Sequence, residues 1–301
     1  MQDRFYRDGF TLIELMVVLA VLALIAVMLL PALAGTRQNV QVIGCLANQR
    51  QLAAAWMMYA HDNNDVLVPN RGLAGQSPLG NMGMDPRSYA DLGPGGQCAD
   101  WCPGNLQLLG DTVPGPYPGG SRYSWWIQAG LIYPYINHIS VYRCPADLSI
   151  VPRGGGPFTA PALRIYSMNG WVQPMDAPGN EPAPWLGIRG YLNYTKLSTL
   201  TRPGPGKTWV FIEENLYTID DGFFPIDPRE SNTWYASPAV LHGNASVLAF
   251  ADGHTDVHRW TDRSMMTERP SSPGGGTGNW PADPNSKDLA WLNSISTFFE
   301  P

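Results

Sequence analysis

Residues 9–35, GFTLIELMVVLAVLALIAVMLLPALAG, decide the fold of this 301-residue chain. Within them, residues 15–35 carry no charged or hydrogen-bonding side chain. About 20 such residues in a helix cross the roughly 30 Å hydrocarbon layer of a bilayer with every backbone polar group satisfied internally. A buried core helix is the alternative, but core helices usually carry polar residues along one face. The stretch therefore predicts a transmembrane helix.

The residues on either side of this segment indicate whether it is retained or removed as a secretory signal. Arg4 and Arg7 precede it, and the Ala-Leu-Ala sequence before Gly35 resembles a signal-peptidase cleavage site. However, the apolar run exceeds the roughly 7 to 15 residues of a signal-peptide core, and it begins directly after a carboxylate, Glu14. We therefore favour a retained segment. A secreted enzyme whose mature chain begins at Gly35 is one alternative.

Glu14 is the informative residue, because a charged side chain inside a bilayer costs free energy. The cost is about 2.5–3.5 kcal/mol at the centre of a membrane helix and less near the interface, so such charges usually pair and mark function. The sequence GFTLIE at residues 9–14 closely resembles the processing site of type IV prepilins and type II secretion pseudopilins.

This resemblance implies roles for three residues. A prepilin peptidase would cut after Gly9 on the cytoplasmic side, and the new N-terminal residue, Phe10, would be N-methylated. The carboxylate of Glu14 would then meet the terminal amine of Phe10 in a neighbouring subunit. The implied partners are the membrane, the peptidase and other pilin or pseudopilin subunits, of the same or a different kind.

The resemblance also implies a location and a function. The expected protein is a single-pass inner-membrane subunit of a type IV pilus-like filament or type II secretion pseudopilus. Its N-terminus would be cytoplasmic and its head periplasmic, or extracellular after filament assembly.

The helix is predicted to continue beyond the membrane segment. Apolar residues recur at spacings of three, four and seven, which is typical of one face of an amphipathic helix: Val42, Leu46, Ala53, Trp56, Met57 and Ala60. Pro31 removes one backbone hydrogen bond and is expected to bend the helix without ending it. The sequence thus predicts one long helix from Phe10 to Asp62.

These patterns and the resemblance predict an α+β, pilin-like fold. A long N-terminal helix, first transmembrane and then amphipathic, would pack on a small antiparallel sheet with long Gly/Pro-rich loops. Strands are predicted at residues 140–144, 164–168, 207–213, 246–251 and 255–260, and a short helix at 121–135. The predicted segments are a removed leader (1–9), the two helix halves (10–35 and 36–63), the head (64–263), a linker (264–285) and a C-terminal helix (286–301).

The composition excludes one class of partner and indicates how the chain folds. The 19 Lys and Arg residues against 25 Asp and Glu give a net charge of −6, which argues against nucleic acid as a partner. The 32 Gly and 28 Pro residues predict a loop-rich chain, while a hydrophobic content of 44% predicts a folded one.

A predicted β-hairpin around Asp252-Gly253 is the second informative feature of the sequence, after the N-terminal motif. Two β-rich runs meet at Asp252-Gly253, the dipeptide typical of a type I′ turn. His242, nine residues and then Asp252-Gly253 resemble the signature of a bacterial prepilin-like family abundant in Planctomycetes and Verrucomicrobia. Residues 45–52, 142–147 and 166–170 also fit this family, for which no enzymatic activity is demonstrated. We expect the ring of His242 to orient the hairpin near Asp252.

The sequence gives little support for a metal site or for a catalytic site. Side chains suited to zinc gather near the hairpin: His242, Asp252, His254, Asp256 and His258. Alternation along a strand places the last three on one face, with Thr255 and Val257 turned inward, so an ordinary solvated face explains them. No motif of a hydrolase, metalloprotease or nucleotide-binding enzyme occurs, and we predict neither an enzyme nor a metal site.

Calcium is the one cofactor to consider, because related pseudopilins often bind it in a carboxylate-rich loop. The candidate ligands are Asp62, Asp65, Asp220, Asp221 and Asp227. None of them has the spacing of an EF-hand loop.

Four cysteines would lie outside the cytoplasm, where disulfides persist. Cys98 and Cys102 are close in sequence and predict a local disulfide. Cys45 and Cys144 lie in the family-like segments, where either packing or pairing would explain them. The C-x3-C spacing is weak evidence for zinc.

The 11 tryptophans support a rival function, that of a membrane-anchored extracellular glycan-binding protein, since exposed aromatic rings stack on sugars. Those beside loop residues include Trp101, Trp171, Trp185, Trp209, Trp234 and Trp280. We favour the alternative that they fill a core with little regular structure.

Overall fold

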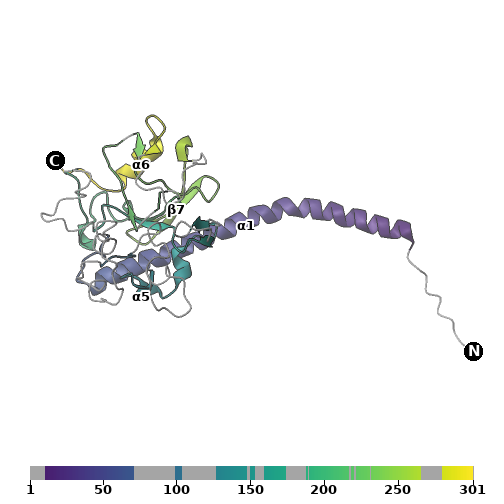
Figure 1. Ribbon diagram of the computed structural model, residues 1–301, viewed down its shortest axis with the longest axis horizontal. Coiled ribbons are helices and arrows are strands. Elements are labelled where there is room, and N and C mark those ends of the chain that lie inside the picture. The colour runs from purple at the N-terminus through teal and green to yellow at the C-terminus, as the bar shows by residue number, and fades with distance from the viewer. Residues whose placement is uncertain are drawn as a thin grey trace, which may run out of the picture. The chain divides into compact units, whose positions relative to one another are not determined.

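A computed structural model describes residues 11–70, 99–103, 127–147, 150–152, 159–173, 188, 190–216, 218–219, 222–230, 232–265 and 280–300 (Figure 1). The chain divides into two compact units, residues 1–41 and 42–301, each treated by itself below. Most of the predicted Gly/Pro-rich loops, 71–98 and 104–126 among them, lie outside the described residues, as does most of the predicted linker.

Helix α1, Leu12–Asp62, confirms the prediction of one long N-terminal helix. It passes Pro31 without interruption. Across the part of the chain that the structure describes, no helix is both long and apolar enough to cross a membrane. The membrane assignment of residues 10–35 therefore stays a prediction.

A five-stranded sheet forms the centre of the second unit, in the order β5-β3-β4-β7-β8. Its strands are β3 (Tyr166–Asn169), β4 (Trp209–Glu213), β5 (Phe223–Phe224), β7 (Ala245–Phe250) and β8 (Thr255–Arg259). Neighbouring strands are antiparallel except β3 and β5, which are parallel. The α+β class is confirmed, but the sheet is mixed and the prediction of a purely antiparallel sheet was wrong.

Two short strand pairs and several short helices complete the described structure. The pairs are β1 (Ile150–Pro152) with β2 (Thr159–Pro161), and β6 (Thr233–Trp234) with β9 (Trp280–Pro281). The helices are α5 (Tyr133–Ile136), α6 (Lys287–Ser294) and the 3-10 turns η1 (Ile139–Tyr142), η2 (Leu197–Thr199) and η3 (Arg263–Met265).

The predicted strand at residues 140–144 is wrong, because the chain there forms the 3-10 turn η1. Val141 and Tyr142 are both buried, which the alternation of a half-exposed strand does not allow. The carbonyl of Arg143 accepts a hydrogen bond from the Asn48 side chain of α1 at 2.8 Å instead of joining a ladder.

The other predicted helices are present but shorter. Residues 127–128 are helical and α5 follows, while residues 121–126 lie outside the described part. The C-terminal helix α6 covers Lys287–Ser294 instead of all of residues 286–301, and the Ser286 side chain caps it by accepting the Leu289 N–H at 3.2 Å.

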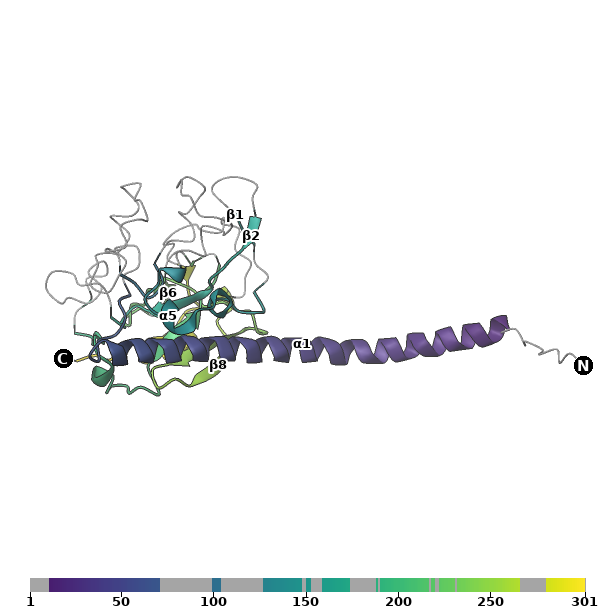
Figure 2. The same ribbon diagram turned by 90° about the horizontal axis from the view of Figure 1, so that it is seen from below.

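The sheet is buried on both faces. Val247 and Ala249 of β7 belong to a core cluster that includes Leu52 and Trp56 of α1. Leu248, the residue between them, belongs to a second cluster, which also holds Leu289 and Leu292 of α6. In both views of the ribbon the central sheet lies beside the part of α1 that belongs to the second unit (Figures 1 and 2). The consecutive apolar residues of β7 thus follow from its position between two helices.

Most of the described tryptophans fill these two clusters. Trp101, Trp171, Trp209 and Trp234 are each at most 1% exposed. Trp280 is half-buried, and Trp185 lies outside the described residues. The four buried rings cannot stack on a sugar, so the structure does not support the glycan-binding alternative.

The β7–β8 hairpin is confirmed, but its turn is not type I′. A type I′ turn requires positive φ at both central residues, and of Asp252 and Gly253 only Gly253 has one, at +88°. The Phe250 N–H donates to the His254 carbonyl at 2.9 Å, which leaves three residues in the loop. A three-residue loop ending on a left-handed glycine is the next most common hairpin connection.

We expect Gly253→Ala to lower the free energy of unfolding by about 2–3 kcal/mol. Left-handed backbone costs a non-glycine residue roughly 1–2 kcal/mol, and a Cβ here would lie 2.8 Å from Cε of Met57 in α1. Gly243→Ala is the matched control, because Gly243 has φ +64° but no atom within 4 Å of the added Cβ. Chemical denaturation of the full chain measures both. Equal losses would show that the Met57 contact does not constrain the turn.

Candidate functional site

The N-terminal motif begins helix α1 with a capping box. The Glu14 carboxylate oxygen Oε2 accepts hydrogen bonds from the Thr11 N–H at 2.8 Å and the Thr11 hydroxyl at 2.7 Å. In return, the Glu14 N–H donates to the Thr11 hydroxyl oxygen at 3.3 Å. This reciprocal T-x-x-E arrangement satisfies backbone donors that the start of a helix leaves unpaired.

The capping role of Glu14 was missed by the sequence reasoning, although T-x-x-E before an apolar run is a recognised helix-start signature. Glu14 is also exposed, so its carboxylate is accessible to a partner. Gly9 and Phe10, the predicted processing residues, lie outside the described residues.

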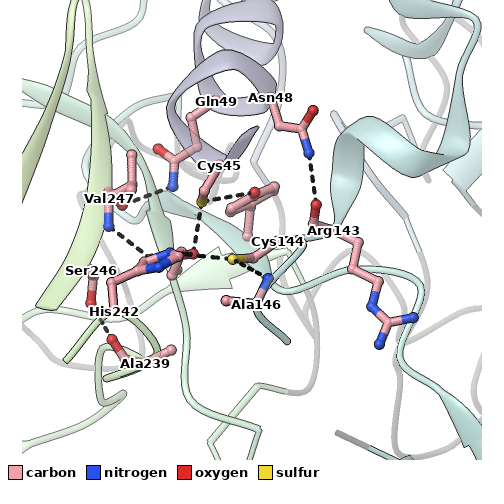
Figure 3. Close-up of polar contacts among 12 residues, drawn as sticks. Cys45, Asn48, Gln49, Arg143, Cys144, Ala146, Ala239, His242, Ser246 and Val247 are labelled. Carbon is pink, nitrogen blue, oxygen red and sulfur yellow. Dashed lines mark hydrogen bonds and ion pairs between the residues drawn. The ribbon is translucent and has the colours of Figure 1, made fainter. Parts of the chain in front are cut away.

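The second site is a buried cluster of four side chains: Cys45, Cys144, Glu213 and His242 (Figure 3). They come from α1, the segment after η1, the end of β4 and the segment before β7. One ligand-type atom from each lies within 4.8 Å of the others. Two of the three family-like segments, 45–52 and 142–147, therefore meet the His242 signature at one place although they are distant in sequence.

Short contacts join the four side chains. The Cys45 thiol donates to Oε1 of Glu213 at 2.8 Å. Nε2 of His242 lies 3.1 Å from the same oxygen and 3.3 Å from Sγ of Cys144. Cys45, Cys144 and Glu213 are fully buried, and His242 is 9% exposed.

The surroundings determine the protonation of the cluster. Burial lowers the pKa of His242, but its hydrogen bonds to Cys144 and Glu213 outweigh this effect and raise that pKa to about 10. Burial, the contact with Cys144 and the charge of Glu213 raise the pKa of the Cys45 thiol well above its usual value. The hydrogen bond from Cys45, with one from His242, lowers the pKa of Cys144. The cluster thus places a buried imidazole and a carboxyl group beside two thiols whose pKa values are shifted in opposite directions.

Two polar side chains of α1 tie the helix to the same region. Nδ2 of Asn48 donates to the Arg143 carbonyl and Nε2 of Gln49 to the Val247 carbonyl, both at 2.8 Å. Figure 3 shows both amides pointing from α1 toward the segments that they contact. Side-chain hydrogen bonds of this kind help to fix the position of a helix on its sheet.

Comparison with known proteins identifies the N-terminal motif. Residues 4–30 match the family model described as the prokaryotic N-terminal methylation motif. The N-terminal segment of the chain therefore carries this motif. Over 87 residues, 29% of this chain and 61% of the relative, it is 32% identical to type II secretion system core protein G of Aeromonas hydrophila. Over 88 residues, 29% of this chain and 56% of the relative, it is 30% identical to the protein of the same name from Pectobacterium carotovorum subsp. carotovorum.

The chain thus spans about three fifths of the length of the curated relatives that it matches. No solved structure matches it.

The structure changes the predicted role of His242. Its ring contacts Glu213 and Cys144, not the hairpin near Asp252, so that prediction was wrong. Asp252 instead accepts the N–H of His254 within the turn, at 3.1 Å.

The predicted solvated face of β8 is only partly correct. Asp256 is exposed, but Val257 is 37% exposed instead of turned inward. His258 is half-buried, because its ring stacks on Trp291 of α6 with centroids 3.7 Å apart. The docking of α6 beside this edge strand is the physical reason for the difference.

The remaining predicted residues do not form sites within the described part of the chain. Cys102 is a free, buried thiol, while Cys98 lies outside the described residues, so their disulfide is not confirmed. Asp62 accepts from the Tyr135 hydroxyl, Asp65 from Ser198 and Asp227 from Arg229, so these candidate calcium ligands are engaged separately. Asp220 and Asp221 lie outside the described residues.

Glu213 was not singled out from the sequence as a site residue. The signal that could have found it is a carboxylate inside the apolar strand TWVFIE, residues 208–213. A charged residue in a strand that is otherwise buried requires a partner.

Proposed function

We propose that this chain is a structural subunit, a pilin or pseudopilin, of a type II secretion pseudopilus or a type IV pilus-like filament. A prepilin peptidase cuts after Gly9 and methylates the amine of Phe10. Before assembly, residues 10–35 hold the subunit in the inner membrane with the head in the periplasm. Its partners are the peptidase and neighbouring subunits.

One observation carries the proposal. The methylation motif, residues 4–30, includes the start of an unbroken 51-residue helix, and its acidic residue, Glu14, lies exposed in the first turn. A filament built from packed N-terminal helices needs such a long apolar helix with a removable leader. The glutamate supplies the negative charge that can neutralise a neighbour's freed amine.

Similarity to the two core proteins G supports a secretion pseudopilus as the assembly, because both relatives belong by name to type II secretion systems.

The N-terminus of the chain recovered from assembled filaments tests this proposal. With an active prepilin peptidase it should be N-methylated Phe10. With an inactivated peptidase the chain should keep its leader and be absent from sheared filaments. An uncleaved chain in filaments would contradict the proposal.

A further inference from the structure

We propose that Cys45, Cys144, Glu213 and His242 form a structural binding site for one zinc ion, or a divalent metal of similar chemistry, that fastens α1 to the sheet. This site is independent of the N-terminal processing motif, and it does not coincide with the carboxylates considered for calcium.

The set of ligand atoms fits zinc. Two thiolates, one imidazole and one carboxylate are the side chains that bind Zn²⁺ in protein sites, almost always four at a time when the role is structural. Calcium and magnesium prefer oxygen ligands and are disfavoured by two sulfurs. Among the described residues, this is the one group of three or more such side chains close enough together to hold an ion.

The distances are also close to those of a metal site. Ligand atoms about 2.0–2.3 Å from a tetrahedral zinc lie roughly 3.3–3.8 Å from one another. Three contacts in the cluster measure 2.8, 3.1 and 3.3 Å, and all four atoms lie within 4.8 Å. Small side-chain rotations would therefore open a space for the ion at their centre.

Outer hydrogen bonds already support three of the four ligands. The Ala146 N–H donates to Sγ of Cys144 at 3.3 Å, and the Val247 N–H donates to Oε2 of Glu213 at 2.8 Å. The Tyr166 hydroxyl lies 3.1 Å from Sγ of Cys45. Metal ligands usually have such second partners, which orient them.

The hydrogen-bond donors around the four ligands also suit the net charge of a zinc-occupied site. Zn²⁺ with two thiolates, a carboxylate and a neutral imidazole carries a net charge of −1. Binding would leave both sulfurs as thiolates and the His242 ring neutral, and the displaced protons would pass to solvent. N–H and O–H donors facing the sulfurs and the carboxylate stabilise the remaining negative charge.

A disulfide between Cys45 and Cys144 is the competing use of the two thiols. Both are free in the structure. A disulfide would involve only the two cysteines and would give no role to the buried His242–Glu213 pair beside them. A metal ion would use all four side chains.

Metal content and cobalt spectroscopy of the full chain test the proposal. The chain is purified in detergent without a histidine tag, equilibrated with Zn²⁺, and freed of excess metal. We expect one zinc per chain. With Co²⁺ in its place, we expect the intense visible bands of a tetrahedral site and thiolate-to-cobalt charge transfer corresponding to two sulfurs.

Variants locate the ion. Cys144→Ser should lose the stoichiometric zinc, and Tyr166→Phe, which keeps all four ligands, should weaken binding about 10- to 100-fold. Cys102→Ser removes a buried thiol elsewhere and His254→Gln removes the hairpin imidazole, so both should retain one zinc. Because Cys144→Ser could unfold the chain, the cobalt spectrum of the unaltered chain decides independently. Absence of bound metal, a spectrum without thiolate bands, or a Cys45–Cys144 disulfide found by non-reducing peptide mapping would overturn the proposal.

Discussion

Glu14→Gln is expected to reduce incorporation of the subunit into filaments at least 100-fold while leaving the start of α1 intact. Glutamine keeps the capping box, since its side-chain oxygen can still accept from Thr11. What it removes is the negative charge that would neutralise the amine of Phe10 in a neighbouring subunit. Leaving a charge unpaired in a buried or membrane environment costs about 3–5 kcal/mol, which corresponds to more than a 100-fold change. Quantitative immunoblotting of sheared filaments measures the effect.

Thr11→Ala is the matched control for this experiment. It removes the hydroxyl that caps the helix but keeps the carboxylate of Glu14. We expect a loss of about 1 kcal/mol of local helix stability and near-normal incorporation. If Glu14→Gln is incorporated normally while Thr11→Ala is not, Glu14 acts as a cap and not as a charge partner.

Trp209→Ala is expected to lower the free energy of unfolding by about 3–5 kcal/mol, a large share of the total stability of a typical domain. The Trp209 ring is fully buried, packs edge-on against Phe224 at 5.5 Å, and donates from Nε1 to the Ser296 hydroxyl oxygen at 2.7 Å. Its removal leaves a cavity at the centre of the second core cluster. Chemical denaturation of the full chain provides the measurement.

Trp291→Ala is the matched control, because Trp291 is half-buried and stacks on His258 at the edge of the sheet. We expect a loss of about 1 kcal/mol, the value of one aromatic pair. If Trp209→Ala left stability unchanged but abolished binding to polysaccharide beads, the aromatic residues would serve recognition and not the core.

The helix and the hairpin could be predicted from the sequence because their signals are local. The residues of α1 carry a long apolar run and then a spacing of three and four, and β7 and β8 are joined by a short glycine turn. The form of the turn could not be predicted, because it depends on which of two neighbouring residues adopts positive φ. Only Gly253 does so, where its missing Cβ also makes room for Met57.

The buried cluster could not be predicted, because it depends on contacts between distant segments. Cys45 and Glu213 are 168 residues apart and Cys144 and His242 are 98 apart, so no spacing pattern relates them. The sequence did single out Cys45, Cys144 and His242 within family-like segments. Their proximity depends on the sheet order, in which β4 lies beside β7. Glu213, at the end of β4, there contacts Cys45 of α1.

Mass spectrometry of the N-terminal peptide of the mature chain, isolated from cells with an active prepilin peptidase, is the most direct test of the proposed processing after Gly9. We predict a chain that begins at Phe10 and carries one methyl group on its amine. A chain that still contains residues 1–9, or one that begins at Gly35, would contradict it.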